Sequence, residues 1–180
     1  MSTYLFLTSN QGVEKPELAD PWAAVERAGG LPTHAAPEKG DVQSMVNDTD
    51  KDAVFQSSIA LADVDAADYD VLVLPGGTVN ADTLRADADA VAFVRAWVDA
   101  KKPVAAICHA PWVLVEAGVL PGKTLTSFPS VSTDVKNAGG SWVDEEVFVC
   151  PGNDWTLITS RNPDDIPAFN RELLKVGGDA

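Results

Sequence analysis

The sequence predicts one α/β domain, residues 1–180, in which helices cover both faces of a mostly parallel central sheet and a nucleophile elbow stands at one sheet edge. Three observations predict this class. Strand-like and helix-like segments alternate along the chain. Three strand-like segments, 3–8, 70–74 and 104–107, are continuously apolar apart from Thr3, Thr8 and Asp70 at their ends, which is typical of strands buried on both faces. The last of them stops at a cysteine that is followed by a histidine and a new helical pattern.

The composition limits the class of partner and the compartment. A formal net charge of −14 disfavours nucleic acids and anionic membrane surfaces, because both are themselves negative. Two cysteines and no leader-like pattern at Met1 predict a reduced, cytoplasmic location. No apolar run approaches membrane-spanning length. Neither a cluster of metal ligands nor a dinucleotide fingerprint is visible, so we expect no metal and no cofactor.

The first half of the chain contains two strands, a helix and a hairpin. Residues 3–8 are β-branched and aromatic and run into Ser-Asn-Gln-Gly, which predicts a strand and its turn. Pro16 suits the first turn of a helix, in which apolar residues recur at helical spacing until two glycines end it at 29–30. A weak strand at 31–36 follows. Residues 42–46 and 53–56, joined by the turn-forming residues 47–52, predict a small hairpin.

The second half alternates more regularly. Residues 63–68 indicate a helical turn or loop, and the strand at 70–74 is closed by Pro-Gly-Gly. The expected helices are 80–85, 87–101, 112–118, 130–138 and 163–176. The expected short strands are 124–127, 142–143, 147–149 and 155–159, and residues 177–180 are expected to form a frayed tail.

The elbow is the strongest chemical signal. A nucleophile in such a turn has a strained backbone, so the residues two before and two after it must be small, and here they are Ala106 and Ala110. Cys108 would lie at a helix N-terminus, which is expected to stabilise a thiolate and lower the thiol pKa, and His109 supplies a base. The alternative is an inert buried cysteine at the end of a core strand.

Two other loops are expected at the same sheet edge. Glu17 follows the first strand, and Gly76 with Gly77 follows the strand at 70–74. Open α/β sheets bind ligands at the carboxyl ends of their strands, so these residues and the elbow are expected to meet. Alternatively, the glycines form an ordinary tight turn, and Glu17 merely complements a helix dipole.

Taken together, several segments resemble, in order and spacing, the PfpI family of intracellular cysteine hydrolases in the class I glutamine amidotransferase-like superfamily. These segments are Glu17-Leu18, Leu72–Gly77, Pro103–Pro111, Ala117–Leu120 with Gly122-Lys123, Asn137–Gly139, Trp142–Asp144 and Ile158–Pro163. The resemblance covers essentially the whole chain.

The resemblance implies a flavodoxin-like three-layer sandwich. It further implies that Cys108 is the nucleophile with His109 as its partner, that Glu17 is a buried glutamate facing the sulfur, and that Gly77, beside Gly76, forms an oxyanion hole with the His109 N–H. In the family, an acidic residue after the Pro-Gly-Gly turn reaches the histidine of a neighbouring subunit. The matching acid is Asp82, which implies a homodimer or a higher homo-oligomer.

Elementary electrostatics supports part of this set. A thiolate and a carboxylate in contact do not both stay charged cheaply, so Glu17 is expected to keep a proton and donate it to the sulfur. A superfamily glutaminase needs a distant histidine late in the chain, and no histidine follows His109, which disfavours an amidotransferase. His34 is expected to be structural or exposed, and Cys150 peripheral.

Together with the elbow, the resemblance implies a cysteine hydrolase that acts on peptide or on glycated or aldehyde-derived carbonyl substrates in a stress or protein-damage response. The resemblance implies peptidase, deglycase or glyoxalase III-like activity without choosing among them. The alternative is a non-enzymatic stress protein, a redox sensor or holdase that uses Cys108 as an oxidisable thiol.

Overall fold

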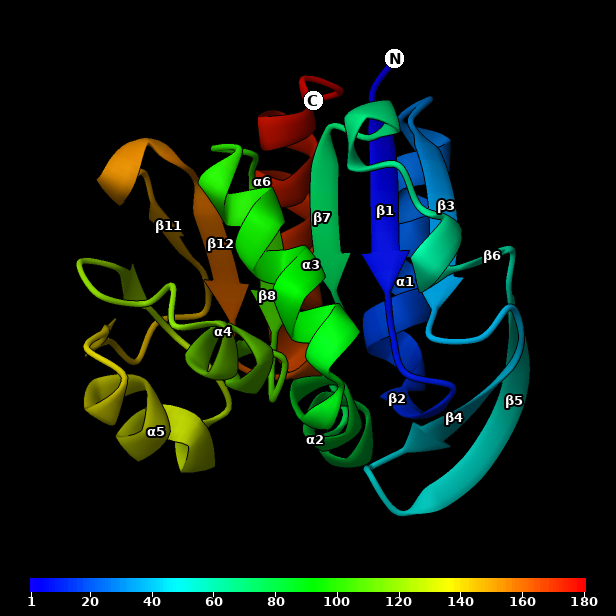
Figure 1. The fold of residues 1–180 in the computed structure, drawn as a ribbon, viewed down its shortest axis with the longest axis horizontal. Coiled ribbons are helices and arrows are strands. Elements are labelled where there is room, and N and C mark those ends of the chain that lie inside the picture. The colour runs from blue at the N-terminus through cyan, green and yellow to red at the C-terminus, as the bar shows by residue number, and fades with distance from the viewer.

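The central element is a seven-stranded sheet in the order β11-β12-β8-β7-β1-β3-β6. The computed structural model describes all 180 residues, and Figure 1 shows the sheet at the middle of the molecule. Its strands are β1 Thr3–Leu7, β3 Leu31–Ala36, β6 Ile59–Ala60, β7 Val71–Leu74, β8 Val104–Ile107, β11 Phe148–Cys150 and β12 Leu157–Ser160. Every neighbouring pair is parallel except β11 with β12. The predicted mostly parallel sheet is confirmed.

Helices cover both faces of the sheet. In Figure 1, α3 (Ala88–Asp99) crosses in front of the strands, whereas α1 (Lys15–Arg27) and α6 (Ile166–Gly177) lie behind them. The helices α2 (Thr78–Ala86) and α4 (Pro111–Ala117) pack with α3 on the front face. The three-layer sandwich predicted from the sequence is thereby confirmed. The short α5 (Ser132–Asn137) lies to one side, beside a small sheet of β9 (Thr124–Leu125) and β10 (Ser141–Trp142).

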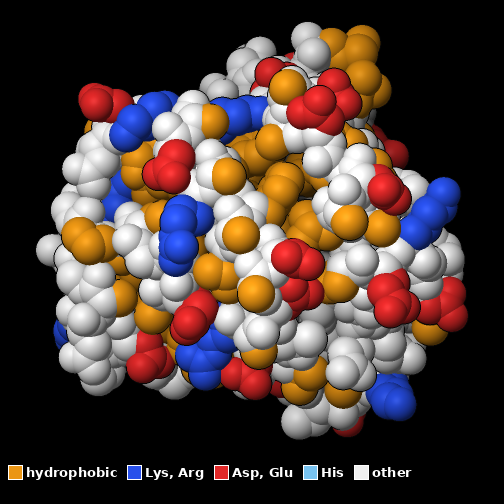
Figure 2. All heavy atoms as spheres, in the orientation of Figure 1, with side chains coloured by type: hydrophobic (Ala, Val, Ile, Leu, Met, Phe, Trp, Pro, Cys, Tyr) orange, Lys and Arg blue, Asp and Glu red, His pale blue; other side chains and the backbone are white.

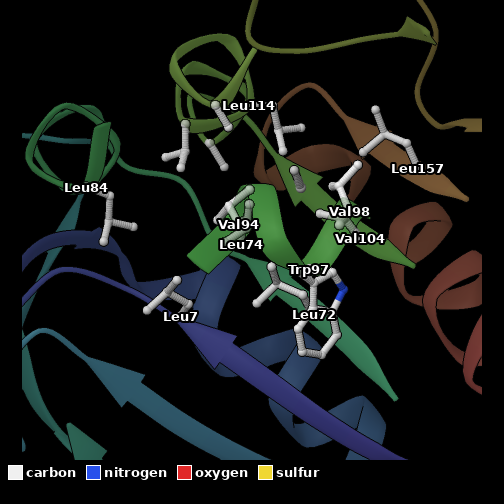
Figure 3. Close-up of a cluster of buried hydrophobic side chains, with 14 of the residues drawn as sticks. Leu7, Leu72, Leu74, Leu84, Val94, Trp97, Val98, Val104, Leu114 and Leu157 are labelled. Atoms are coloured by element: carbon white, nitrogen blue, oxygen red, sulfur yellow. The ribbon is translucent and has the colours of Figure 1, made fainter. Parts of the chain in front are cut away.

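The alternation of side chains along the strands divides the core into two clusters. In β1, Leu5 and Leu7 point into the front cluster with α3, whereas Tyr4 and Phe6 point into the rear cluster with α1 and α6. Figure 3 shows the front cluster, in which Leu7 of β1 and Leu72 and Leu74 of β7 belong to the same group of side chains as Trp97 of α3. Burying one large apolar side chain stabilises a fold by about 1.5–3 kcal/mol, so both faces of these strands contribute.

A second sheet, of β2 (Gln11–Glu14), β4 (Gly40–Val46) and β5 (Asp50–Ser57), stands at the carboxyl end of β1. The antiparallel β4–β5 hairpin is as predicted. Strand β2 was not predicted, because it is short and its partner β4 lies about thirty residues further along the chain. Its register with β4 shifts at Gly12, whose φ of +87° breaks the alternation that would reveal a strand.

Single 3₁₀ turns complete the chain at Leu61–Asp63, Ala66–Asp68, Pro129–Val131, Gly152–Asp154 and Pro163–Asp165.

The C-terminal residues are anchored, which differs from the frayed tail that the sequence suggests. Gly178 has a φ of +81° and ends α6 in a left-handed turn. The following Asp179 then accepts a hydrogen bond from the Tyr4 hydroxyl at 2.9 Å. The Ser2 hydroxyl donates to the Gly177 carbonyl, so the two ends of the chain are tied together.

The surface agrees with an acidic protein. On the face in Figure 2, Lys and Arg side chains are scattered among Asp and Glu and form no continuous basic patch. None of the helices combines the length and the apolar character that crossing a membrane requires.

A lysine without a carboxylate partner is buried between β9 and the β11–β12 connection. The Lys123 side chain is 1% exposed, and its ammonium donates to the carbonyl groups of Cys150 (3.3 Å), Trp155 (2.6 Å) and Gly152. The ammonium also lies 3.7 Å from the centre of the Trp155 ring. Burial lowers the pKa of Lys123 to about 8. The Lys123 side chain is therefore the hydrogen-bond donor for three carbonyl groups of this connection.

We expect Lys123→Met to lower the free energy of unfolding by about 3 kcal/mol, because two buried carbonyl groups and the partly buried carbonyl of Gly152 lose their donor. Urea unfolding measures the change. The control is Lys136→Met, since Lys136 is exposed and its ammonium lies 5.7 Å from the Trp142 ring, and it should leave stability nearly unchanged. Equal stability of both variants would show that the Lys123 ammonium is dispensable.

Candidate active site

Cys108 occupies the elbow between β8 and α4. Its φ is +63°, in the left-handed region that side chains other than glycine rarely adopt. The turn is held from both sides, because the Cys108 N–H donates to the Ser160 carbonyl at 3.0 Å and the Cys108 carbonyl accepts from the Phe128 N–H at 2.8 Å. Ala106 and Ala110 are buried around it, in agreement with the predicted need for small residues. The strained backbone thus aims the sulfur at the carboxyl edge of the sheet.

His109 lies against the sulfur. Its Nδ1 atom is 3.1 Å from Cys108 Sγ, and its Nε2 atom is 3.4 Å from the Thr78 hydroxyl. The imidazole stacks on Phe128, with ring centres 4.6 Å apart, and contacts Trp112 on another side. Burial lowers the His109 pKa, which favours the neutral imidazole that can take a proton from the thiol.

Glu17 projects from the first turn of α1 into the site and is fully buried. Its Oε2 atom accepts a hydrogen bond from the Gly76 N–H at 2.8 Å. Its Oε1 atom has no hydrogen-bond partner in the chain, and the carboxyl group lies close enough to the Cys108 thiol for each to shift the pKa of the other. Burial raises the Glu17 pKa to about 8, so at neutral pH the carboxyl group is mostly protonated and can donate to the sulfur. These contacts favour a role in the site over a simple helix-dipole role.

The Cys108 thiol is less acidic than its position before a helix suggests. Burial raises its pKa, and the charge that Glu17 carries when ionised raises it further, whereas the Gly77 N–H lowers it. The sequence-based expectation of a lowered pKa considered the helix and left out the burial. Because α4 begins only at Pro111, its dipole acts from three residues away. A thiolate therefore forms more readily while Glu17 keeps its proton.

Gly76 and Gly77 are required by close contacts as well as by the turn. A Cβ atom on Gly76 would lie 2.3 Å from Glu17 Oε2 and 2.8 Å from Cys108 Cβ. Gly77 has a φ of +94° and begins α2, and its N–H stabilises a thiolate at Cys108. The N–H of His109 donates to no group of the protein. The Gly77 and His109 N–H groups thus remain the candidate oxyanion hole.

Asp82 does not join the site within one chain. Its carboxylate is 62% exposed on α2 and forms an ion pair with Arg85 at 3.0 Å. The Arg85 guanidinium in turn lies 4.5 Å from the centre of the Trp112 ring, on which His109 also packs. Its exposure leaves Asp82 accessible to a second subunit, and its predicted contact with a neighbouring His109 remains a proposal.

Sequence reasoning missed the tip of the β4–β5 hairpin. Asp48 lies there in a turn and accepts a hydrogen bond from the Thr78 N–H at 2.7 Å, which joins the hairpin to the start of α2. The tip is held by Glu14, whose two carboxylate oxygens accept the Asn47 and Asp48 N–H groups at 2.9 Å each. The turn itself was predicted, but no local signal shows that it folds back over Cys108.

The remaining cysteine and histidine lie outside the site. Cys150 pairs across β11–β12 with Leu157, which in turn pairs with Val104, four residues before Cys108. That offset alone is about 13 Å along a strand, beyond the reach of a disulfide. Both cysteines are free. His34 is buried, with its Nε2 atom 2.8 Å from the Thr8 hydroxyl, and burial lowers its pKa to about 4, as expected for a structural histidine.

We expect Glu17→Gln to raise the pKa of the Cys108 thiol by about one unit, because an amide N–H is a weaker donor to a thiolate than a carboxyl O–H. The rate of alkylation by iodoacetamide as a function of pH measures this pKa. A lowered pKa would show that Glu17 is ionised in the wild type and repels the thiolate, and an unchanged profile would return Glu17 to a helix-dipole role.

The same variant tests the protonation of Glu17 through stability. The Glu17 pKa is raised from 4.5 to about 8 in the folded state, so its ionisation destabilises the fold progressively as the pH rises through this interval. Glu17→Gln should therefore increase the free energy of unfolding at pH 8 and have little effect at pH 4.

The fold and the site together define a class of protein: an α/β sandwich with a cysteine nucleophile at a strand-to-helix elbow. An adjacent histidine and a buried glutamate complete the site. The family model "DJ-1/PfpI family" matches residues 2–176. The chain belongs to this family, which confirms the resemblance seen in the sequence.

Individual relatives agree with this assignment. General stress protein 18 of Bacillus subtilis is 43% identical over 161 residues, which cover 89% of this chain and 90% of the relative. Deglycase PfpI of Pyrococcus furiosus is 36% identical over 96% of this chain and 97% of its own. Protein/nucleic acid deglycase 2 of Escherichia coli is 46% identical over 66% of this chain and 67% of its own.

Solved structures of related proteins have the same fold. Drosophila melanogaster DJ-1beta superposes with a TM-score of 0.81 at 31% identity and covers 99% of this chain and 92% of its own. A two-domain protein of Anabaena variabilis with DJ-1/ThiJ/PfpI-like and ferritin-like domains gives a TM-score of 0.88 at 30% identity. The match covers 99% of this chain and 48% of that protein.

Proposed function

We propose that this protein is a cysteine hydrolase of the PfpI type that acts on peptide or on glycated or aldehyde-derived carbonyl substrates in the response to stress and protein damage. The observation that carries the proposal is the contact of Cys108 Sγ with His109 Nδ1 at 3.1 Å, at a backbone φ of +63° and beside the buried Glu17 that lines the same cavity. Relatives named as deglycases and as a stress protein support it.

The residues present can carry out an acyl transfer. His109 takes the thiol proton, Sγ forms a bond to the carbonyl carbon, and the electron pair of the C=O bond moves to oxygen. The N–H groups of Gly77 and His109 hold that oxyanion. When the C=O bond re-forms, the bond from carbon to nitrogen breaks and the leaving amine takes the proton from His109. Water then cleaves the thioester, which releases the acid and restores the thiol.

Removal of an aldehyde adduct uses the same sulfur. In that case Sγ forms a bond to the aldehyde-derived carbon, either by adding to the C=O bond of a free 2-oxoaldehyde or by displacing the amine from its adduct, so that the C–N bond breaks and the amine leaves with the thiol proton passed on by His109. A proton then moves from that carbon to the neighbouring carbonyl carbon, whose oxygen becomes a hydroxyl, which leaves a thioester of a 2-hydroxy acid. Water again releases the product, so that 2-oxoaldehyde and water together give 2-hydroxy acid. Both routes pass through a bond between carbon and Cys108 Sγ.

This shared bond gives the test. The protein is incubated with methylglyoxal, with a methylglyoxal-modified peptide and with a fluorogenic peptide, and lactate, free amine and fluorophore are measured. Mass spectrometry of the quenched protein should find an acyl group on the Cys108 peptide. No product from any substrate, together with reversible oxidation of Cys108, would overturn the proposal in favour of a redox sensor.

We further propose that the protein is a homodimer or a larger homo-oligomer in which Asp82 approaches the neighbouring His109. Light scattering at micromolar concentration should give at least twice the mass of one chain. Asp82→Asn should lower turnover about tenfold, because the imidazolium loses a carboxylate partner. The control is Asp89→Asn, an exposed acid on α3. A monomer with full activity in Asp82→Asn would contradict this arrangement.

A further inference from the structure

We propose that Asp48 is a specificity-determining residue that selects substrates bearing a cationic nitrogen, an ammonium or guanidinium group, close to the carbon that Cys108 attacks. This inference rests on the proposed hydrolase function and names the class of substrate. Lysine and arginine side chains, and carbonyl adducts formed next to them, carry such nitrogens.

The cavity over the sulfur is acidic. It has a volume of about 250 Å³ and is lined by Glu14, Glu17, Asn47, Asp48, Cys108, Phe128 and Pro163. Three of these seven residues carry a carboxyl group, and none is lysine, arginine or histidine. A substrate that reaches Cys108 through this cavity therefore meets negative charge, and no cationic side chain lines the cavity to compensate it.

The three carboxyl groups differ in their hydrogen bonds and in their protonation. Glu14 is occupied, because both of its oxygens accept backbone N–H groups of the hairpin tip. Glu17 is fully buried and mostly protonated, and its Oε1 atom has no nitrogen or oxygen partner in the cavity. Asp48 accepts the Thr78 N–H with Oδ1 alone. Its Oδ2 atom makes no hydrogen bond and is available to a ligand.

The hairpin tip fixes this carboxylate in place. Asn47 and Asp48 both have positive φ, +54° and +62°, and the Thr49 N–H closes the turn on the Val46 carbonyl at 3.4 Å. Two central residues with positive φ are what a type I′ hairpin turn requires. With Thr78 and Glu14 anchoring the tip as well, the carboxylate is positioned before substrate arrives, so little ordering is required on binding.

The charge of Asp48 reaches the reacting groups. It raises the pKa of Cys108 and of Glu17 and opposes the lowering of the His109 pKa. In the absence of substrate, this charge disfavours the thiolate of Cys108, so Asp48 does not help to activate the empty site. A cationic substrate group beside Asp48 would neutralise the charge and thereby make the thiolate easier to form. The site would thus be activated by the substrates that it selects.

Charged thiol reagents test this electrostatic selection without requiring turnover. The rates at which Cys108 reacts with a trimethylammonium-ethyl and with a neutral methyl methanethiosulfonate are measured, and their ratio cancels any change in thiol pKa. Asp48→Asn keeps an oxygen for the Thr78 N–H and tolerates a positive φ, so the turn should persist. We expect this ratio of cationic to neutral rate to fall about tenfold.

The matched control is Asp50→Asn, which removes an exposed acid at the start of β5, two residues further along the hairpin. Its ratio should equal that of the wild type. An unchanged ratio in Asp48→Asn, or an equal fall in both variants, would overturn the proposal. Cys150 is replaced by alanine in all proteins so that only Cys108 reacts.

A second arm measures turnover of methylglyoxal-modified arginine amide and of free methylglyoxal, which is neutral. Asp48→Asn should raise KM for the arginine adduct about tenfold and leave KM for methylglyoxal unchanged. If the wild type turns over neither substrate, the hydrolase function fails while the thiosulfonate ratio still decides the role of Asp48. A lowered ratio with equal effects on both KM values would contradict selection of cationic substrates.

Discussion

Replacing Cys108 with alanine is expected to lower kcat for every substrate by at least about 10⁴-fold, because the covalent step has no other nucleophile within reach. The fold should survive, because alanine and cysteine meet the same strain at a φ of +63°. Turnover assays and urea unfolding measure the two quantities.

Cys150→Ala is the matched control for that variant. Cys150 is also buried and free, and its sulfur accepts the Thr124 N–H at 3.4 Å, but it lies at the other end of the sheet. It should keep full turnover and lose at most about 1 kcal/mol of stability. Activity that persists in Cys108→Ala, or that is lost in Cys150→Ala, would contradict the assignment of the nucleophile.

Gly77→Ala is expected to reduce kcat at least about 100-fold and to lower the free energy of unfolding by about 3 kcal/mol. The new Cβ atom would lie 2.2 Å from the Gly12 carbonyl oxygen and 2.7 Å from the Glu14 nitrogen, so backbone atoms would have to move. That movement shifts the Gly77 N–H away from the position of an oxyanion.

Gly118→Ala separates this clash from backbone strain. Gly118 ends α4 with a φ of +70°, and nothing lies within 4 Å of an added Cβ atom there. We expect it to cost about 1 kcal/mol, the strain of a left-handed residue, and to leave kcat unchanged. If Gly77→Ala behaved in the same way, Gly77 would have no role in the oxyanion hole.

The central sheet was predictable because its signal is local. Strands β1, β7 and β8 are buried on both faces, so their apolar runs identify them without knowledge of their neighbours. The parallel arrangement then places their carboxyl ends at one edge, which is how Glu17, Gly76 and Cys108 come together.

The β4–β5 hairpin itself was predicted, but its position over the site was not predictable, because that position depends on contacts between distant residues. Strand β2 exists through pairing with β4, and Asp48 reaches the site through Thr78, thirty residues away in sequence. Neither contact leaves a periodic pattern. The direction of the Cys108 pKa was wrong for a related reason, since burial results from the packing of several elements.

The anchored chain ends have a practical consequence for protein engineering. Ser2 bonds to Gly177 and Tyr4 to Asp179, so the two ends lie side by side, at the opposite end of the strands from Cys108. A short Gly-Ser linker could join them into a circular permutant. New ends placed in the turn at Pro121 and Gly122 would open the chain away from β8, α1 and the hairpin tip, and would leave the Cys108 site intact.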